Sequence, residues 1–341
     1  MNKAYHKFIY SYTIAMLLLL VTLTACNTKK TEADSQPAFQ IDQESIKLGQ
    51  EGLVRFEKTI TYYPDSSLQH YVQQVGQRIL NATPAKNTPF TFRLIESAYP
   101  QAYALPNGHV FLTTGMLALF SNESQLAALL AHEIAHVIAG HTRNRSRKRK
   151  QIASLTQRLN KALTTKRSHE MTRLFGKVSI QNYSRKNEYQ ADKLSVGYLQ
   201  RSPYSEYATL DVLERLQLSM LKATKNTSDK QRIFSSHPAI EKRIETLKRL
   251  YPHESTPVEK KYLIRINNLV LDRKKGKRLQ LKLYTFTTKD ALSNHLRKIE
   301  KQNHLLYELI LAINFAKAEN QLKSGQILKW LVVTDDIKAA H

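Results

Sequence analysis

The stretch from Leu126 to Gly140, which reads LAALLAHEIAHVIAG, restricts the possible fold more than any other part of the chain. Its only polar side chains are His132, Glu133 and His136, so a helix here would be apolar on nearly every side and therefore buried. Burying ionisable groups without partners is costly, whereas a bound cation would satisfy both imidazoles at once. The stretch therefore predicts a buried helix built around a metal site.

The spacing of the two histidines agrees with this interpretation. His132 and His136 are four residues apart, so on a helix their Cβ atoms lie roughly 5–6 Å apart on one side, close enough to share one zinc ion. Glu133 lies beside the pair and is placed to take a proton from a metal-bound water. The alternative is a core helix whose histidines make ordinary hydrogen bonds, but HExxH within an uncharged helix favours zinc.

The ends of this helix are marked by residues that commonly cap helices. Ser121 and Asn122 are good N-caps, Gln125 can complete a capping box, and Gly140 suits the position just after the C-terminus. His141, five positions after His136, would point to another side of a continuous helix, so we expect it to be a helix-end residue without a functional role.

A third metal ligand is expected further along the chain. The metzincin pattern does not apply, because Ala139 and Thr142 stand where it needs Gly and His. Glu188 and Asp192 are four residues apart, so on one helix the first can reach the metal while the second orients a ligating imidazole through its free ring N–H. Alone, such an acidic pair usually marks a solvated face, but after HExxH it predicts a ligand and its support.

The N-terminus has the pattern of an export signal. Basic residues precede an apolar run over 14–23, and Leu23-Thr-Ala-Cys26 follows, which resembles a bacterial lipoprotein signal peptide with its lipobox. The resemblance implies that 1–25 is removed, that Cys26 is lipidated, and that 26–45 is a polar tether. A plain secretory signal or a short anchor is the alternative. Cys26 is the only cysteine, which excludes an internal disulfide and a cysteine metal ligand.

The chain is strongly basic, with a formal net charge of +24. Such a charge suits nucleic acid, anionic membranes or acidic polymers, but an exported lipoprotein has no route to cellular DNA. We therefore expect no nucleic-acid partner and assign the charge to a membrane or envelope surface. We expect the protein in the bacterial periplasm, where Asn27 after the lipobox favours anchoring to the outer membrane. The densest basic run, Arg143 to Lys150, is either a solvated helix or loop, or a contact with anionic lipid, an acidic substrate or a trimming protease.

Four motifs together carry a family resemblance. They are AYALPNGHVFLTTGML at 102–117, HEIAH at 132–136, SRKNEYQAD at 184–192 and SSHPAIEKRIETL at 235–247. In this order they resemble the gluzincin metallopeptidases of the HtpX and CAAX-prenyl-endopeptidase superfamily, most closely its periplasmic lipoprotein branch. The resemblance implies an α+β fold over 46–254, mainly helical, with a small β-sheet edging the cleft.

The resemblance also implies roles for individual residues. His132, His136 and Glu188 would bind one Zn²⁺ per chain, Glu133 would be the general base, and Asp192 would support a ligand. The strand over 109–113 would edge the cleft, where an extended peptide can pair with it. His237 would approach the zinc, either capping it in a latent state or stabilising the oxyanion; alternatively, it is the N-cap of the helix after Pro238.

Outside these motifs, the apolar periodicity predicts further elements. Helices are expected over 46–60 and 68–80 and a strand over 90–95. After a proline-marked linker, 255–341 is expected to form a small α/β domain with strand, helix, helix and strand at 279–286, 290–298, 305–313 and 322–333. This order resembles a degenerate LysM domain and would suggest contact with peptidoglycan; a simple packing appendage is the alternative. No tetratricopeptide pattern is recognisable.

Two functions follow from these observations. The first is a zinc-dependent endopeptidase that cleaves misfolded or stalled envelope proteins, with outer-membrane proteins the expected substrates. The second is a latent, chaperone-like or scaffolding lipoprotein in outer-membrane assembly, whose zinc site is held closed. Glu133 favours the first, because a scaffold needs the zinc but not the base.

Overall fold

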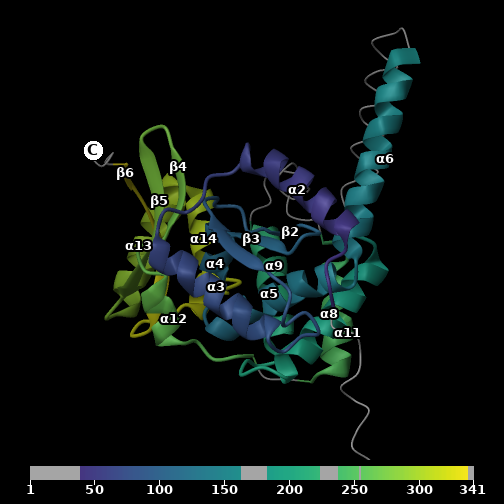
Figure 1. Ribbon diagram of the computed structural model, residues 1–341. Helices are drawn as coiled ribbons and strands as arrows, with labels where there is room; N and C mark the ends of the chain where they lie inside the picture. The colour runs from purple at the N-terminus through teal and green to yellow at the C-terminus, as the bar shows by residue number, and fades with distance from the viewer. Residues whose placement is uncertain (1–38, 163–182, 223–236, 253–254, 337–341) are drawn as a thin grey trace, which may run out of the picture. The chain divides into compact units, whose positions relative to one another are not determined.

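The computed structural model describes residues 39–162, 183–222, 237–252 and 255–336. Cys26, the apolar N-terminal run and most of the tether lie outside these residues, as do Ser235 and Ser236 of the fourth motif. From Phe39 onwards the chain forms one unit, in which helices predominate and two three-stranded sheets are present (Figure 1). The predicted α+β class is confirmed. Within the described ranges no helix is long and apolar enough to cross a membrane.

Two helices come before the first strand, as predicted. They are α2 (Gln43–Glu57) and α3 (Ser66–Leu80), and each begins after an aspartate whose side chain accepts a hydrogen bond from a backbone N–H of the first turn. These bonds satisfy helical N–H groups that otherwise have no partner. Helix α3 buries one apolar face, including Val72, Val75 and Ile79, against the core.

The first sheet has the order β1-β3-β2, from β1 (Thr91–Ile95), β2 (Ala102–Ala104) and β3 (His109–Thr113). Strand β3 runs parallel to β1 and antiparallel to β2. The prediction that 109–113 edges the cleft was therefore wrong, because β3 is the central strand and β2 lies at the edge. The turn between β2 and β3 needs glycine at position 108, where φ is +83°. A Cβ atom at this position would lie only 2.8 Å from the backbone oxygen of Pro89.

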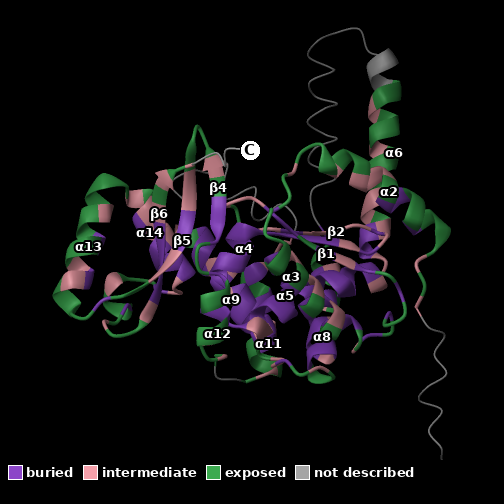
Figure 2. Ribbon diagram, turned by 60° about the vertical axis from the view of Figure 1, so that its left-hand side comes forward, coloured by how far each residue is buried: buried purple, intermediate pink, exposed green. Residues whose placement is uncertain are grey.

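The helical core lies on one face of this sheet. It contains α4 (Thr114–Leu119), α5 (Glu123–Ile138), α8 (Arg185–Gln200), α9 (Ala208–Lys222) and α11 (Ile240–Leu250). Every residue of α5 from Gln125 to Val137 is buried (Figure 2). On the other face of the sheet, the Phe56 ring of α2 packs 4.9 Å from that of Phe111. The predicted HEIAH helix is thus the buried centre of the fold.

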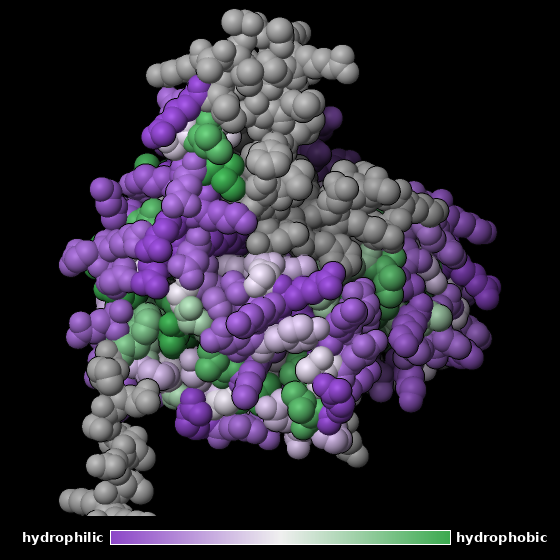
Figure 3. All heavy atoms as spheres, turned by 90° about the vertical axis from the view of Figure 1, so that its right-hand side faces the viewer, coloured by the Kyte–Doolittle hydropathy of each residue, from purple (hydrophilic) through white to green (hydrophobic). Residues whose placement is uncertain are grey.

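The basic run after α5 is a helix, α6 (His141–Ala162), that lies beside α2 (Figure 1). Arg143 and Arg147 form ion pairs with Asp42 and Glu44, and Lys150 Nζ lies 2.8 Å from Glu51 Oε1. These pairs are solvent-exposed, so each contributes little to stability. The face of the molecule on this side is mostly hydrophilic (Figure 3).

The C-terminal part forms a second sheet with two covering helices. Its elements are α12 (Lys260–Arg265), β4 (Val270–Lys274), β5 (Lys277–Thr285), α13 (Lys289–Gln302), α14 (His304–Ile313), the short 3₁₀ helix η2 (Glu319–Gln321) and β6 (Ile327–Asp335). All pairs in the order β4-β5-β6 are antiparallel. The four predicted elements are present, but β4 precedes them, so the sheet has three strands where strand-helix-helix-strand implied two.

This C-terminal sheet packs directly against α4. Lys329 of β6 is buried, and its Nζ donates to the carbonyl oxygens of Ala118 and Phe120 at 2.8 and 3.0 Å. The Tyr262 hydroxyl donates to the Leu117 carbonyl at 2.9 Å. One hydrophobic cluster contains residues of both regions, so the C-terminal part shares its core with the helices around α5.

Candidate metal centre

Helix α5 begins and ends at the residues that the sequence marks. Asn122 Oδ1 accepts a hydrogen bond from the Gln125 backbone N–H at 2.9 Å, and Gln125 Oε1 accepts one from the Ser121 N–H at 2.8 Å. The helix ends at the C-cap Ala139, and Gly140 follows with a φ of +70°. These caps define where the helix begins and ends, and so place the HEIAH segment in its C-terminal half.

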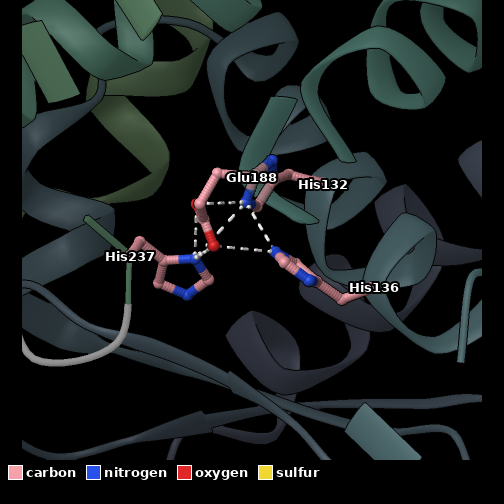
Figure 4. A group of neighbouring side chains, drawn as sticks. All are labelled: His132, His136, Glu188 and His237. Atoms are coloured by element: carbon pink, nitrogen blue, oxygen red, sulfur yellow. Dashed lines mark hydrogen bonds and ion pairs between the residues drawn. The ribbon is translucent and has the colours of Figure 1, made fainter. Parts of the chain in front are cut away.

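Four side chains from three segments converge on one point (Figure 4). His132 and His136 come from α5, Glu188 from the first turn of α8, and His237 from the segment before α11. One ligand atom from each lies within 4.8 Å of all the others. His132 Nε2 is 3.0 Å from His136 Nε2 and 3.6 Å from Glu188 Oε2, and His136 Nε2 is 3.5 Å from Glu188 Oε1.

These separations fit a tetrahedral metal. Ligand atoms about 2.0–2.1 Å from one zinc ion lie about 3.3 Å from one another at tetrahedral angles, close to the separations between the two imidazoles and the carboxylate. Glu133 fits as well, because it is buried and its Oε2 has no hydrogen-bond partner within the described part of the chain. A buried carboxylate oxygen without a partner is costly, and water held by a metal would provide one.

His132 contacts Asp192 on the side away from the cluster, as the four-residue spacing of Glu188 and Asp192 predicts. His132 Nδ1 lies 3.0 Å from Asp192 Oδ1, which leaves Nε2 facing the cluster. Burial opposes a charge on His132, but the contacts with Asp192 and Glu188 outweigh it and raise the pKa of the imidazole to about 9 in the metal-free protein. Such a carboxylate fixes the ring orientation and makes the imidazole a stronger ligand.

Arg243 of α11, which the sequence interpretation missed, contacts both acidic residues of the site. Its Nε and Nη2 donate to the two Asp192 carboxylate oxygens at 2.7 and 2.6 Å, and its Nη1 lies 2.7 Å from Glu188 Oε2. Burial favours the neutral forms of both carboxyls, but Arg243, together with His237 at Glu188, keeps their pKa values below the usual range. The sequence gives a signal for its burial, because Arg243 falls on the same helix face as Ile240, Ile244 and Leu247, but none for its partners.

His141 is a helix-end residue, as expected, but the structure also places it against a candidate metal ligand. Its Nδ1 lies 3.0 Å from His136 Nδ1, and its Nε2 lies 3.2 Å from Gln190 Oε1 of α8. The expectation assumed a continuous helix, but Gly140 turns the chain in the left-handed conformation and α6 begins at His141. Burial lowers the pKa of the His141 imidazole, which favours its neutral form.

Tyr183, just before α8, covers one face of the His136 ring. The two rings are nearly parallel, with their centroids 4.0 Å apart. On Tyr183, in turn, lies the guanidinium of Arg145, with its carbon 4.7 Å from the ring centroid. The cation therefore connects α6 to a candidate metal ligand through one aromatic ring.

His237 lies over the cluster rather than at a helix end. Its Nδ1 is 3.1 Å from both Glu188 oxygens and 3.4 Å from His132 Nε2, and its Nε2 is 3.5 Å from Glu133 Oε1. The N-cap alternative was wrong, because α11 begins at Ile240 and its N-cap is Ala239.

An apolar cavity opens beside His132 and Glu133. Its apolar walls come from four helices and include Met116 of α4, Leu129 of α5, Val212, Leu213 and Leu216 of α9, and Ile240 of α11. Ala102 of the edge strand β2 also lines it. The candidate metal centre and the edge strand β2 thus line the same apolar cavity.

Known proteins resemble this chain over the same region. The model of the peptidase family M48 matches residues 66–251. The beta-barrel assembly-enhancing protease of Escherichia coli strain K12 is 30% identical over 189 residues, covering 53% of this chain and 38% of that protein. The mitochondrial metalloendopeptidase OMA1 of Schizosaccharomyces pombe is 27% identical over 195 residues, covering 56% of this chain and 55% of that protein.

The matched part is thus about two fifths of the length of the bacterial relative and about half of that of the yeast protein. The names of both relatives describe proteases, and a metallopeptidase family implies a bound metal, which the convergence of the four side chains can accommodate. Because the family model covers more than half of the sequence, the chain belongs to peptidase family M48, as its four motifs predict.

Proposed function

We propose that this protein is a zinc-dependent endopeptidase in which His132, His136 and Glu188 hold one zinc ion and Glu133 is the general base. The observation that supports this most is Glu133 Oε2, which is buried beside the converging ligand atoms and has no partner among the described residues. A purely structural metal site would have no use for this carboxylate, since structural sites are closed by their ligands.

The residues of the chain then divide the hydrolysis between them. A zinc ion held by His132, His136 and Glu188 would supply Lewis-acid chemistry: it would polarise the substrate carbonyl and lower the pKa of water at the site to roughly 7. Glu133 takes the proton from the attacking water and later delivers it to the nitrogen of the leaving amine. The peptide bond breaks into a carboxylate and an amine, and no covalent bond to the chain forms. Asp192 and Arg243 keep His132 and Glu188 in place throughout.

The substrate is expected to bind as an extended peptide along β2. The Gln101 carbonyl accepts a hydrogen bond from the Thr113 N–H, and the Leu105 N–H donates one to the His109 carbonyl. The backbone groups of Ala102 and Ala104 therefore point away from β3. A peptide that adds to this edge gains main-chain hydrogen bonds whatever its sequence. The apolar cavity next to Glu133 would then take one side chain adjacent to the cleaved bond, which favours aliphatic or aromatic residues there.

Substrates in the cell envelope agree with the sequence and the relatives. The lipobox ending at Cys26 supports a lipid-anchored periplasmic protein, with Asn27 favouring the outer membrane. The name of the bacterial relative refers to β-barrel assembly. We therefore propose misfolded or stalled outer-membrane proteins as substrates, with the outer-membrane assembly machinery as a partner. Contact of the basic C-terminal part with peptidoglycan stays a prediction.

A second candidate, a latent zinc protein, is favoured by His237. A ligand atom of His237 lies in one cluster with those of the other three residues, so it could hold a metal ion with them and would then exclude the attacking water. In this state the protein would act as a chaperone or scaffold until His237 moves away. If His237 instead remains near the open site, its imidazole can stabilise the oxyanion.

Digestion of unfolded casein by the mature chain from Asn27 tests the enzymatic proposal. We expect cleavage that 1,10-phenanthroline abolishes and added zinc restores, with apolar residues flanking the cleaved bonds in the fragments. Cleavage that persists in the chelator would exclude the zinc mechanism. An inactive protein with one bound zinc per chain would favour the latent candidate.

A further inference from the structure

We propose that His141 and Gln190 form a positioning chain for the His136 imidazole, the counterpart of what Asp192 does for His132. The inference rests on the proposed function, because it takes His136 as a zinc ligand. It assigns a role to two residues that belong neither to the HExxH pattern nor to the Glu188/Asp192 pair. It also makes the two imidazoles unequal, since one is supported by a carboxylate and the other by neutral groups only.

The directions of the hydrogen bonds follow from the last member of the chain. A glutamine side-chain oxygen can only accept, so His141 Nε2, 3.2 Å away, carries the proton and donates it. The neutral His141 ring then has a bare Nδ1, which accepts from the Nδ1–H of His136 at 3.0 Å. His136 is thereby held in the tautomer whose Nε2 lone pair points at the ligand cluster.

The surrounding structure holds the positioning chain of His141 and Gln190 in place. Gly140, with its φ of +70°, brings His141 back against the helix that carries His136, and both histidines are buried. Tyr183 stacks on one face of the His136 ring and fixes the plane of the ring, while the contact with His141 fixes its rotation within that plane. Gln190 lies two residues after Glu188 on α8, so one helix supplies both a ligand and the end of the positioning chain.

The neutral partners have a chemical consequence. A carboxylate behind a ligating imidazole raises its basicity and tightens metal binding, whereas an imidazole and an amide do so less. His136 is therefore the weaker donor of the two, which leaves the metal more electrophilic than two carboxylate-supported imidazoles would. A negative charge at position 190, the far end of the positioning chain, should strengthen His136 as a ligand through His141.

The test is a double-mutant cycle on zinc affinity. Gln190 is exposed, so Gln190→Glu keeps the size of the side chain and should not disturb folding. We expect this variant to bind zinc several-fold more tightly in competition with a chelator, and His141→Phe to bind about 10–100-fold more weakly. In the His141→Phe background, Gln190→Glu should have no effect, because its route to His136 is gone. Gln200→Glu, an exposed change at the end of α8, is the matched control for added charge.

Absorption spectra of the cobalt-substituted proteins give a readout independent of stability. The ligand-field bands should move in opposite directions in Gln190→Glu and His141→Phe and stay in place in Gln200→Glu. Circular dichroism of the metal-free forms shows whether each variant is folded. An affinity change in Gln190→Glu that persists with Phe at position 141, or no change at all in a zinc-binding protein, would overturn the inference. A wild-type chain that binds no zinc would instead refute the proposed function.

Discussion

Asp192 Oδ1 lies 3.0 Å from His132 Nδ1, and this contact joins the two helices that carry the candidate zinc ligands. His132 belongs to α5 and Asp192 to α8, one turn after Glu188. Both acidic residues also contact Arg243, so the arginine ties α11 to the same site. The candidate ligands are thus held by a buried network of charged side chains.

Zinc binding should release a proton from His132. The imidazole pKa of about 9 means that His132 is protonated near pH 7.5 in the metal-free protein, and zinc needs it neutral. The favourable contribution of His132 to metal-free stability is complete below its unfolded pKa of about 6.5 and is lost as the pH rises through 9. Zinc affinity should therefore rise with pH up to about 9.

Calorimetry in buffers of different ionisation enthalpy measures this release. About one proton per zinc is expected near pH 7.5 for the wild-type chain, and fewer for Asp192→Asn, because the amide no longer holds the charge on His132. Zinc binding without proton release at this pH would contradict the charged state of His132.

Removal of Arg243 should destabilise the metal-free protein strongly. Arg243→Met keeps the length of the side chain but leaves Asp192 and Glu188 buried without their cation, which typically costs about 3–5 kcal/mol. Urea denaturation gives the free energy of unfolding directly. Arg249→Met, an exposed change on the same helix, should cost less than about 0.5 kcal/mol. Added zinc should restore part of the lost stability of Arg243→Met, because it neutralises Glu188. Equal losses of unfolding free energy in the two variants would refute the role of Arg243.

Replacement of His237 should separate the two functions proposed for it. The four-membered cluster favours a capping role, so His237→Ala should raise the rate of casein cleavage and weaken zinc binding. If the imidazole stabilises the oxyanion, the same variant should lose rate without a loss of zinc affinity. Measurement of both quantities on one preparation distinguishes these results, and no change in either would exclude both roles.

The buried Lys329 should matter for stability although it lies in the C-terminal part. Lys329→Ala removes the aliphatic stem and leaves the Ala118 and Phe120 carbonyls without this donor, which should cost about 2–5 kcal/mol. Lys277→Ala, an exposed change in the same sheet, should have little effect. A small cost for Lys329→Ala in thermal or urea unfolding would contradict the packing of β6 on α4.

Elements with strong local signals could be predicted from the sequence. Helix α5 has capping residues at both ends and an apolar surface, and it lies within a few residues of its expected position. Strand β3 begins and ends at the predicted residues because the glycine turn at Gly108 fixes its start. Strand β4 was missed, since only Val270 and Leu271 of its five residues are buried and charged residues follow.

The site was predictable where its chemistry follows a fixed spacing. His132, His136, Glu188 and Asp192 meet because each pair is four residues apart on one helix. His141 could not be placed, because its position depends on the left-handed turn at Gly140 rather than on helical periodicity. Arg243 could not be assigned from spacing either, because its partners lie 51 and 55 positions earlier in the chain and meet it only through tertiary packing.

The central claim is that Glu133 acts as the base of a zinc peptidase, and the most direct test compares the wild-type chain with Glu133→Gln. Both proteins should contain one zinc per chain, because Glu133 is not among the ligands. The rate of casein cleavage should fall by at least about 100-fold in the variant, the usual contribution of a general base. A Glu133→Gln variant that binds zinc and cleaves casein at the wild-type rate would contradict the account.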